Sequence, residues 1–373
     1  MHKIVFGIEE LDELLTIVNS RKLFVVTDSS FPLLNIRERI DNIAVEKAFF
    51  SDFSPNPLFE DVCKGIEFFK KEACDAILAV GGGSAIDVAK CIKLAVLARE
   101  GRDAIIPPLV LEKVGIDGSR IPIIAIPTTA GTGSESTHNA VIYYKGEKQT
   151  VTNDGILPDW ALLEPKVLNT LPVYQKKCTM MDALCQGIES WWSVNSTPDS
   201  REYAQQALRL IRENWRSYIL ENRPYAASKI MLAANFAGRA INISATTAAH
   251  AMSYKITSIY GLPHGHAVAV CLPELWDHMI THTGDCIDPR GEEYMAHIFG
   301  RISAELGAGS PAEAIERFRK IMDEMGLENP VSVNRSEELR QLAGSVNPIR
   351  LKNNPVMLSA ETLYGLYDKI VKP

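Results

Sequence analysis

Four polar side chains in the C-terminal half of the chain have the residue types and spacing of a divalent metal site. Asp182 and Gln186 are four residues apart, so they share one face of a helix whose pattern starts near Met180. His250 and His264 follow, the latter in a Pro-His-Gly-His string. Carboxylate and imidazole groups that converge from separate helices can hold Fe(II) or Zn(II), and such an ion can polarise a carbonyl group.

Each of these side chains also has an ordinary structural interpretation. A histidine between alanines, as at His250, is commonly a hydrogen-bonded core residue, and Asp182 could simply cap its helix. The hypothesis of a metal site therefore rests on the set and not on any one member. The histidines that fit no ligand pattern are His2, His138, His278, His282 and His297.

Two loops of small residues in the N-terminal half are typical of phosphate binding. The apolar run 76–80 leads into GGGS at 81–84, where a helix opens at Ser84. Glycines let the backbone approach a phosphate, and a helix N-terminus offers it N–H groups. A second apolar run, 121–127, leads into TTAGTGSE at 128–135, which is rich in hydroxyl donors. Such loops at the carboxyl ends of parallel strands predict a dinucleotide site.

A third element of that site is Asp28, which ends an earlier apolar run. Its carboxylate could accept hydrogen bonds from the adenosine ribose and would repel a 2′-phosphate, which favours NAD over NADP. Taken alone, Asp28 is as well explained as a turn or cap residue. The G-x-G-x-x-G pattern of the ordinary Rossmann fingerprint is not in the sequence, so the prediction depends on the two loops.

The pattern of apolar residues along the chain changes near residue 158. Before it, β-rich runs alternate with helical periodicity, which predicts a parallel sheet covered by helices; after it, helical periodicity prevails. We therefore predict an α/β dinucleotide-binding domain over residues 1–155 and an all-helical substrate and metal domain over 156–373. The predicted strands are 23–27, 76–80 and 121–126, and the predicted helices are 56–72, 85–99, 182–192, 200–219, 225–242, 245–260, 291–306 and 312–325.

Composition and charge exclude several classes of protein. The chain has 373 residues, 46% of them hydrophobic, and a net charge of -7 without any basic run, so neither nucleic acid nor a membrane surface is expected as a partner. No apolar run approaches the roughly 18 residues of a membrane span, and the acidic N-terminal segment does not resemble a signal peptide. Seven cysteines without a C-x-x-C pair predict reduced thiols and a cytoplasmic location.

Five strings resemble, in order and spacing, those of the iron-containing alcohol dehydrogenase family. They are FSPNP at 53–57, GGGSAID at 81–87, PTTAGTGSE at 127–135, MDAL at 181–184 and PHG at 263–265. The resemblance implies a Rossmann-like α/β N-terminal domain and an all-α C-terminal domain, an architecture shared with dehydroquinate synthase. It also implies NAD(P)-dependent interconversion of alcohols with aldehydes or ketones, a metal in the cleft between the domains, and a homodimer.

The resemblance further assigns roles to single residues. The cofactor positions of the family fall on Asp28, Gly82, Gly83, Ser84, Asp87, Thr128, Thr129 and Thr132. Its metal ligands, one aspartate and three histidines, fall on Asp182, Gln186, His250 and His264. Glutamine thus stands where a histidine is usual, which should weaken the binding of Fe(II) or Zn(II). Tyr254 stands where many members carry a histidine that relays the proton of the alcohol.

Two longer strings, at 181–196 and 250–258, resemble the phosphonoacetaldehyde reductase branch of that family. This implies a small, anionic aldehyde as substrate and requires a cation near it, for which Lys255 and His266 are the candidates. As a single residue, Lys255 is as well explained as a solvated helix lysine. We expect hydride transfer from the nicotinamide to the carbonyl carbon, with a proton supplied through water, Tyr254 or His266.

Two other functions fit the same pattern. One is a lyase similar to dehydroquinate synthase, which uses NAD transiently and shows no net redox change. The other is a catalytically silent nucleotide-binding homologue, for which the glutamine at Gln186 is the only sequence argument. Oxidation of NADH in the presence of an aldehyde distinguishes the reductase from both.

Overall fold

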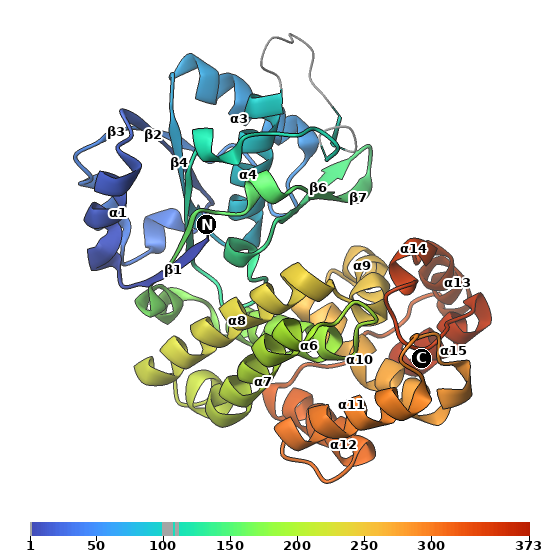
Figure 1. Cartoon of the computed structure of the whole chain (residues 1–373). Helices are drawn as coiled ribbons and strands as arrows, with labels where there is room; N and C mark the ends of the chain where they lie inside the picture. The colour runs from blue at the N-terminus through green and yellow to red at the C-terminus, as the bar shows by residue number, and fades with distance from the viewer. Residues whose placement is uncertain (1, 99–106, 109–111) are drawn as a thin grey trace. The chain divides into compact units, whose positions relative to one another are not determined.

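The computed structural model describes residues 2–98, 107–108 and 112–373, and it divides into two compact units, Met1–Leu171 and Pro172–Pro373 (Figure 1). This division lies beyond the predicted boundary at residues 155/156. The reason is strand β8 (Trp160–Leu163), which pairs with β1 and β5 and so belongs to the sheet of the first unit.

The first unit contains a six-stranded sheet whose strand pairs are all parallel. In spatial order the strands are β1 (Lys3–Phe6), β8, β5 (Ile123–Pro127), β4 (Ala76–Gly81), β2 (Lys22–Thr27) and β3 (Glu46–Phe50). Every residue of β4 and β5 is buried, as expected for strands with both faces covered. The predicted α/β class is therefore confirmed.

In the described part of this unit, four helices connect these strands, and a separate hairpin adds a second small sheet. The helices are α1 (Leu11–Val18), α2 (Arg37–Asp41), α3 (Phe59–Lys71) and α4 (Gly83–Ala98). The end of the helix predicted over 85–99 reaches Arg99, which lies outside the described residues. The antiparallel hairpin of β6 (Asn139–Tyr144) and β7 (Glu147–Thr152) is not among the predicted elements.

The order of the strands reverses between β2 and β4. From β2 the chain moves outward to β3, returns to β4 on the other side of β2, and continues in the opposite direction to β5 and β8. Open parallel sheets bind ligands beside the carboxyl ends of the strands at such a reversal. The registers Thr27↔Val80 and Gly81↔Pro127 place the carboxyl ends of β2, β4 and β5 at one edge of the sheet.

The second unit is helical, which confirms the predicted class. Its helices are α6 (Val173–Trp192), α7 (Pro198–Ile219), α8 (Pro224–Ser244), α9 (Ala248–Tyr260), α10 (His264–Thr281), α11 (Glu292–Glu305), α12 (Pro311–Met325), α13 (Arg335–Ser345), α14 (Pro348–Leu351) and α15 (Ala360–Ile370). None of the helices in the described residues is both long enough and apolar enough to cross a membrane.

Several helices of the second unit differ from the sequence prediction, and α13, α14 and α15 are not among the predicted helices at all. Helix α6 begins at Val173, directly after Pro172, and not near Met180. Helix α10 is not among the predicted helices either. It contains Pro273, a residue type that normally interrupts a helix, and most of its residues are buried. None of the seven cysteines, all of which lie in the described residues, forms a disulfide bond; the reduced state stays a prediction.

Candidate functional site

Three of the predicted metal ligands meet in the second unit. Asp182 of α6, His250 of α9 and His264 of α10 each direct a ligand atom into one cluster, and these atoms all lie within 4.8 Å of one another. His250 Nε2 is 3.3 Å from Asp182 Oδ1, and the two imidazole rings are 5.4 Å apart between centroids. Asp182 and His250 are buried and His264 is partly exposed. The cluster is therefore a largely buried group of ligand atoms, of which only those of His264 belong to a partly exposed residue.

A glycine allows α10 to approach α6 closely enough to form this cluster. A Cβ atom at Gly265 would lie 2.0 Å from the carbonyl oxygen of Cys178 and 2.8 Å from Asp182 Cβ. No larger residue fits there without a shift of the backbone. Because Gly265 directly follows His264, this contact brings the first turn of α10 against the turn of α6 that carries Asp182.

A fully buried carboxylate, Glu189, holds His250 in place and was missed by the sequence reasoning. Glu189 Oε1 accepts hydrogen bonds from the backbone N–H of Thr247 at 3.0 Å and its hydroxyl at 2.8 Å. The other oxygen pairs with His250 Nδ1. Such a carboxylate fixes the orientation of a metal-binding imidazole and makes it a stronger ligand. The available signal was spacing, because Glu189 lies two helical turns after Asp182.

The electrostatics of His250 suit a cation site. Burial disfavours the imidazolium, but the carboxylates of Glu189 and Asp182 outweigh it and raise the pKa of His250 to about 9. With Nδ1 bonded to Glu189, Nε2 faces Asp182. A neutral Nε2 lone pair opposite a carboxylate oxygen is unfavourable, so the pair calls for a positive charge between them, either a proton or a metal ion.

His264 has its coordinating nitrogen set by a neighbouring hydroxyl. Ser253 Oγ donates to the His250 carbonyl at 2.8 Å, so its oxygen is left to accept from His264 Nδ1 at 3.4 Å. This arrangement puts the proton on Nδ1 and leaves the Nε2 lone pair available as a ligand. The fourth predicted ligand, Gln186, is buried one turn beyond Asp182 on the same face of α6.

The three residues predicted to act on the substrate have different surroundings. The ring of Tyr254 stacks on that of His264, with centroids 5.8 Å apart and planes at 24°. Lys255 follows on α9 and is partly exposed. His266 is buried, and both its ring nitrogens are engaged, Nδ1 with the Tyr174 hydroxyl and Nε2 with the Glu328 carbonyl, each at 2.9 Å.

The bonds of His266 argue against proton transfer by this residue. A carbonyl oxygen only accepts, so Nε2 carries the proton and Nδ1 accepts from the tyrosine. Burial also lowers the pKa of His266, so its protonated form is disfavoured. To donate a proton or bind an anion, His266 would have to give up one of these bonds, so we leave it out of the proposed site.

In the first unit, the predicted cofactor residues gather at the carboxyl ends of β2, β4 and β5. Asp28 Oδ2 accepts from the Gly82 backbone N–H at 3.0 Å, while Oδ1 accepts from the Ser30 N–H at 2.9 Å. The Thr128 N–H donates to the Gly81 carbonyl at 3.0 Å. Asp28 thus joins the loop after β2 to the loop after β4. Because Oδ1 also accepts from the Ser30 hydroxyl, Oδ2 is the oxygen with a lone pair left for a ligand hydroxyl.

The remaining cofactor residues line the two glycine-containing loops or support them. Gly83, Ser84, Thr129 and Thr132 are partly exposed, and Thr128 is buried. Asp87 faces the protein, because it accepts from the Ser134 hydroxyl and, at 2.9 Å, from the Val141 N–H. The nearby Lys90 is buried and also bonds to Ser134, which ties the second loop to α4. Asp87 therefore supports the second loop and does not present both its oxygens to a ligand.

The contact between these loops gives a prediction at Gly83. A Cβ atom there would lie 2.8 Å from both Thr132 Cγ2 and Oγ1, so in Gly83→Ala the Thr132 side chain, or the loop that carries it, must shift. We expect this variant to weaken NADH binding and to lower the free energy of unfolding by about 1–3 kcal/mol. The matched control for stability is Gly82→Ala, whose Cβ would lie at an ordinary 3.5 Å from Thr129. Equal unfolding temperatures for the two variants would contradict the packing argument.

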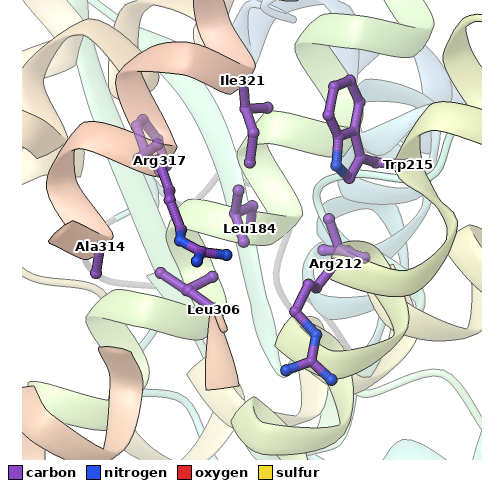
Figure 2. Close-up of a pocket in the computed structure, with 9 residues that line it drawn as sticks. Leu184, Arg212, Trp215, Leu306, Ala314, Arg317 and Ile321 are labelled. Carbon is purple, nitrogen blue, oxygen red and sulfur yellow. The ribbon is translucent and has the colours of Figure 1, made fainter. Parts of the chain in front are cut away.

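A separate pocket in the second unit contains none of these site residues (Figure 2). It is bounded by side chains of α6, α7 and α12 and by Leu306, and it is mainly apolar. Two arginines, Arg212 and Arg317, contribute to its lining. Because it holds no carboxylate or imidazole, it is not a candidate for the predicted metal chemistry.

Comparison with known proteins identifies both halves of the chain. Residues 2–165 match the model of the family "Iron-containing alcohol dehydrogenase", and residues 177–371 match that of the "Fe-containing alcohol dehydrogenase family, C-terminal". Phosphonoacetaldehyde reductase of Streptomyces viridochromogenes is 34% identical over 304 residues, which cover 78% of this chain and 74% of the relative. NAD-dependent methanol dehydrogenase of Bacillus methanolicus is 30% identical over 322 residues, 83% of this chain and 80% of that one.

A solved structure resembles the whole chain. It is the sulfoacetaldehyde reductase of Bifidobacterium kashiwanohense in complex with NAD+, with a TM-score of 0.86 and 27% identity. The match covers 99% of this chain and 96% of that one. The likeness thus extends over both units.

Proposed function

The chain belongs to the iron-containing alcohol dehydrogenase family, and from this we propose that it reduces a short aldehyde with an anionic tail, at the expense of NADH. Oxidoreductase activity with NAD and an alcohol or aldehyde is the common property of the family. The anionic substrate, the metal and the residue roles are our proposal. The observation that carries it is the cluster of Asp182, His250 and His264.

The donor set of this cluster fits Fe(II) or Zn(II). One carboxylate and two imidazoles can occupy one face of the ion and leave positions for a substrate oxygen. Gln186, one turn from Asp182, could add a neutral amide oxygen. Since a glutamine oxygen is a weaker donor than imidazole, we expect the metal to be held less tightly than by three histidines.

The proposed reaction adds one hydride to the carbonyl carbon and one proton to its oxygen, and NADH becomes NAD+. When bound, NADH supplies the hydride and the metal ion stabilises the negative charge that develops on the oxygen. Asp28, Gly82 and Gly83 hold the nucleotide at the carboxyl ends of β2 and β4, with Thr129 and Thr132 on the facing loop. Asp28 favours NAD because a 2′-phosphate would meet its carboxylate.

Tyr254 is the proposed route for the proton. Its ring packs on the ring of His264, so Tyr254 lies directly beside the metal cluster. A phenol can pass a proton to an alkoxide directly or through a water molecule. His266 does not take this role, for the reasons given by its two hydrogen bonds.

Two relatives support the anionic substrate. The Streptomyces protein is a phosphonoacetaldehyde reductase and the Bifidobacterium protein a sulfoacetaldehyde reductase, and both names describe acetaldehyde with an acidic group on the neighbouring carbon. The predicted homodimer and cytoplasmic location stay predictions.

The test is the oxidation of NADH, followed by its ultraviolet absorbance, with phosphonoacetaldehyde, sulfoacetaldehyde and unbranched neutral aldehydes of similar length. The protein is first stripped of metal and then assayed with Fe(II) or Zn(II). We expect one alcohol formed for each NADH oxidised, and faster turnover of an anionic aldehyde. Transient use of NAD without net oxidation would favour the lyase. No turnover with any aldehyde, either metal and either nucleotide would favour the silent homologue.

A further inference from the structure

We infer that Arg350 binds the anionic group of the substrate, a tetrahedral phosphonate or sulfonate, while the aldehyde end lies at the metal cluster. This inference rests on the proposed function and adds the residue that selects the substrate. Arg350 lies in the short helix α14, and the sequence reasoning did not single it out.

The first observation is a continuous row of side chains that leads from the cluster to Arg350. His264 belongs to the cluster, and the Tyr254 ring stacks on it at 5.8 Å between centroids. The Arg350 guanidinium carbon then lies 5.5 Å from the centroid of the Tyr254 ring. A substrate that spans from the cluster across Tyr254 therefore ends beside a guanidinium group.

The second observation is that the segment carrying Arg350 is fixed to the helices that build the cluster. Asn353, three residues on, accepts from the Ser193 hydroxyl at 2.8 Å, just beyond the end of α6. Its amide group donates to the carbonyls of Ser244 and Thr246, each at 2.9 Å, in the connection between α8 and α9. The segment that carries Arg350 is thus tied to the same connection that leads to Thr247 and His250.

The third argument is electrostatic. Asp182 of the cluster and Glu189 behind it are buried carboxylates whose two negative charges would balance the charge of a divalent ion, so the cluster as a whole offers an anionic substrate no net attraction. A cation at the far end of the substrate supplies this attraction and orients the molecule with its aldehyde toward the metal ligands. Without such a cation, the acidic end would compete for the metal.

Arginine is better suited to this task than the previously considered Lys255. A guanidinium group is planar and always charged, and it offers paired N–H donors that match two oxygens of a phosphonate or sulfonate. Lys255 directly follows Tyr254 on α9, so it projects from a different side of that helix.

The test compares Arg350→Met with Lys255→Met and with Lys352→Met, which removes an exposed cation two residues away. Each variant is assayed with an anionic aldehyde and with a neutral aldehyde of the same length. We expect Arg350→Met to lower kcat/KM for the anionic aldehyde by about 10- to 100-fold, mainly through KM, because a hydrogen bond to a charged group is lost. Turnover of the neutral aldehyde should stay within about threefold of wild type, and Lys352→Met should change neither.

A direct binding measurement separates recognition from catalysis. The alcohol products, 2-hydroxyethylphosphonate and 2-hydroxyethylsulfonate, are titrated calorimetrically into the wild type and Arg350→Met with NAD+ present. Loss of binding in the variant for both ligands supports a general oxyanion site, and loss for one alone identifies the acid that the site selects.

Three results would overturn the inference. These are equal losses for the anionic and neutral aldehydes, a selective loss in Lys255→Met with Arg350→Met unaffected, and a wild type that reduces both aldehydes with the same kcat/KM. In each of these cases the wild type still reduces aldehydes, so only the inference about Arg350 fails. If the proposed function itself were wrong, the wild type would oxidise no NADH with any aldehyde.

Discussion

Replacing His264 by alanine is expected to lower kcat by about 10³-fold or more while NADH binding is retained. The substitution removes one of the three ligands that meet in the cluster. Loss of a Lewis acid costs several kcal/mol of transition-state stabilisation, and each ~1.4 kcal/mol is a factor of ten in rate. The proposed nucleotide residues lie in the other unit, Met1–Leu171, so NADH fluorescence titration should give a Kd close to that of the wild type. Elemental analysis should show less bound metal.

Two further variants sharpen this experiment. His297→Ala removes an exposed histidine of α11 and serves as the matched control, with unchanged metal content and activity. Gln186→His changes the site in the opposite direction, because it restores the set of one aspartate and three histidines that the family resemblance implies. We expect tighter binding of Zn(II) in a competition titration. Wild-type turnover in all three single variants, Asp182→Ala, His250→Ala and His264→Ala, would refute the site assignment.

Replacing Glu189 by glutamine is expected to weaken metal binding by about 10- to 100-fold, although Glu189 is not among the proposed ligands. An amide of the same shape cannot accept from Thr247 and from His250 Nδ1 as a carboxylate does. Its NH2 group would favour the other tautomer of His250, in which the proton sits on the nitrogen that faces Asp182. We also expect the unfolding free energy to fall by about 1–3 kcal/mol, since Glu189 is fully buried.

The measurements are metal affinity by competition with a chelating dye and thermal unfolding of the metal-free protein. Glu293→Gln, at an exposed position in the first turn of α11, is the matched control and should leave both unchanged. A purely structural Glu189 would lower stability but leave the metal affinity of the folded protein at the wild-type value. That outcome would remove Glu189 from the site.

Much of the fold follows from local sequence patterns. Buried parallel strands such as β4 are continuous apolar runs. In amphipathic helices such as α7 and α12, apolar residues recur every three to four positions, so both kinds of element can be recognised in the sequence. Local patterns fail where tertiary burial overrides them. Pro273 lies inside α10, and the short strand β8 is recognised only by its pairing with β1 and β5.

The sequence by itself determined the chemical types at the candidate site, because Asp182, His250, His264 and the glycine loops are recognisable from residue identity and spacing. Only the tertiary structure decided how these groups are used. It shows Glu189 behind His250, both nitrogens of His266 bonded within the protein, and Arg350 beside Tyr254. The physical reason is range: helical and strand periodicity act over a few residues, whereas a hydrogen bond or a cation over a ring joins groups up to about a hundred residues apart, and no local pattern records which groups will meet.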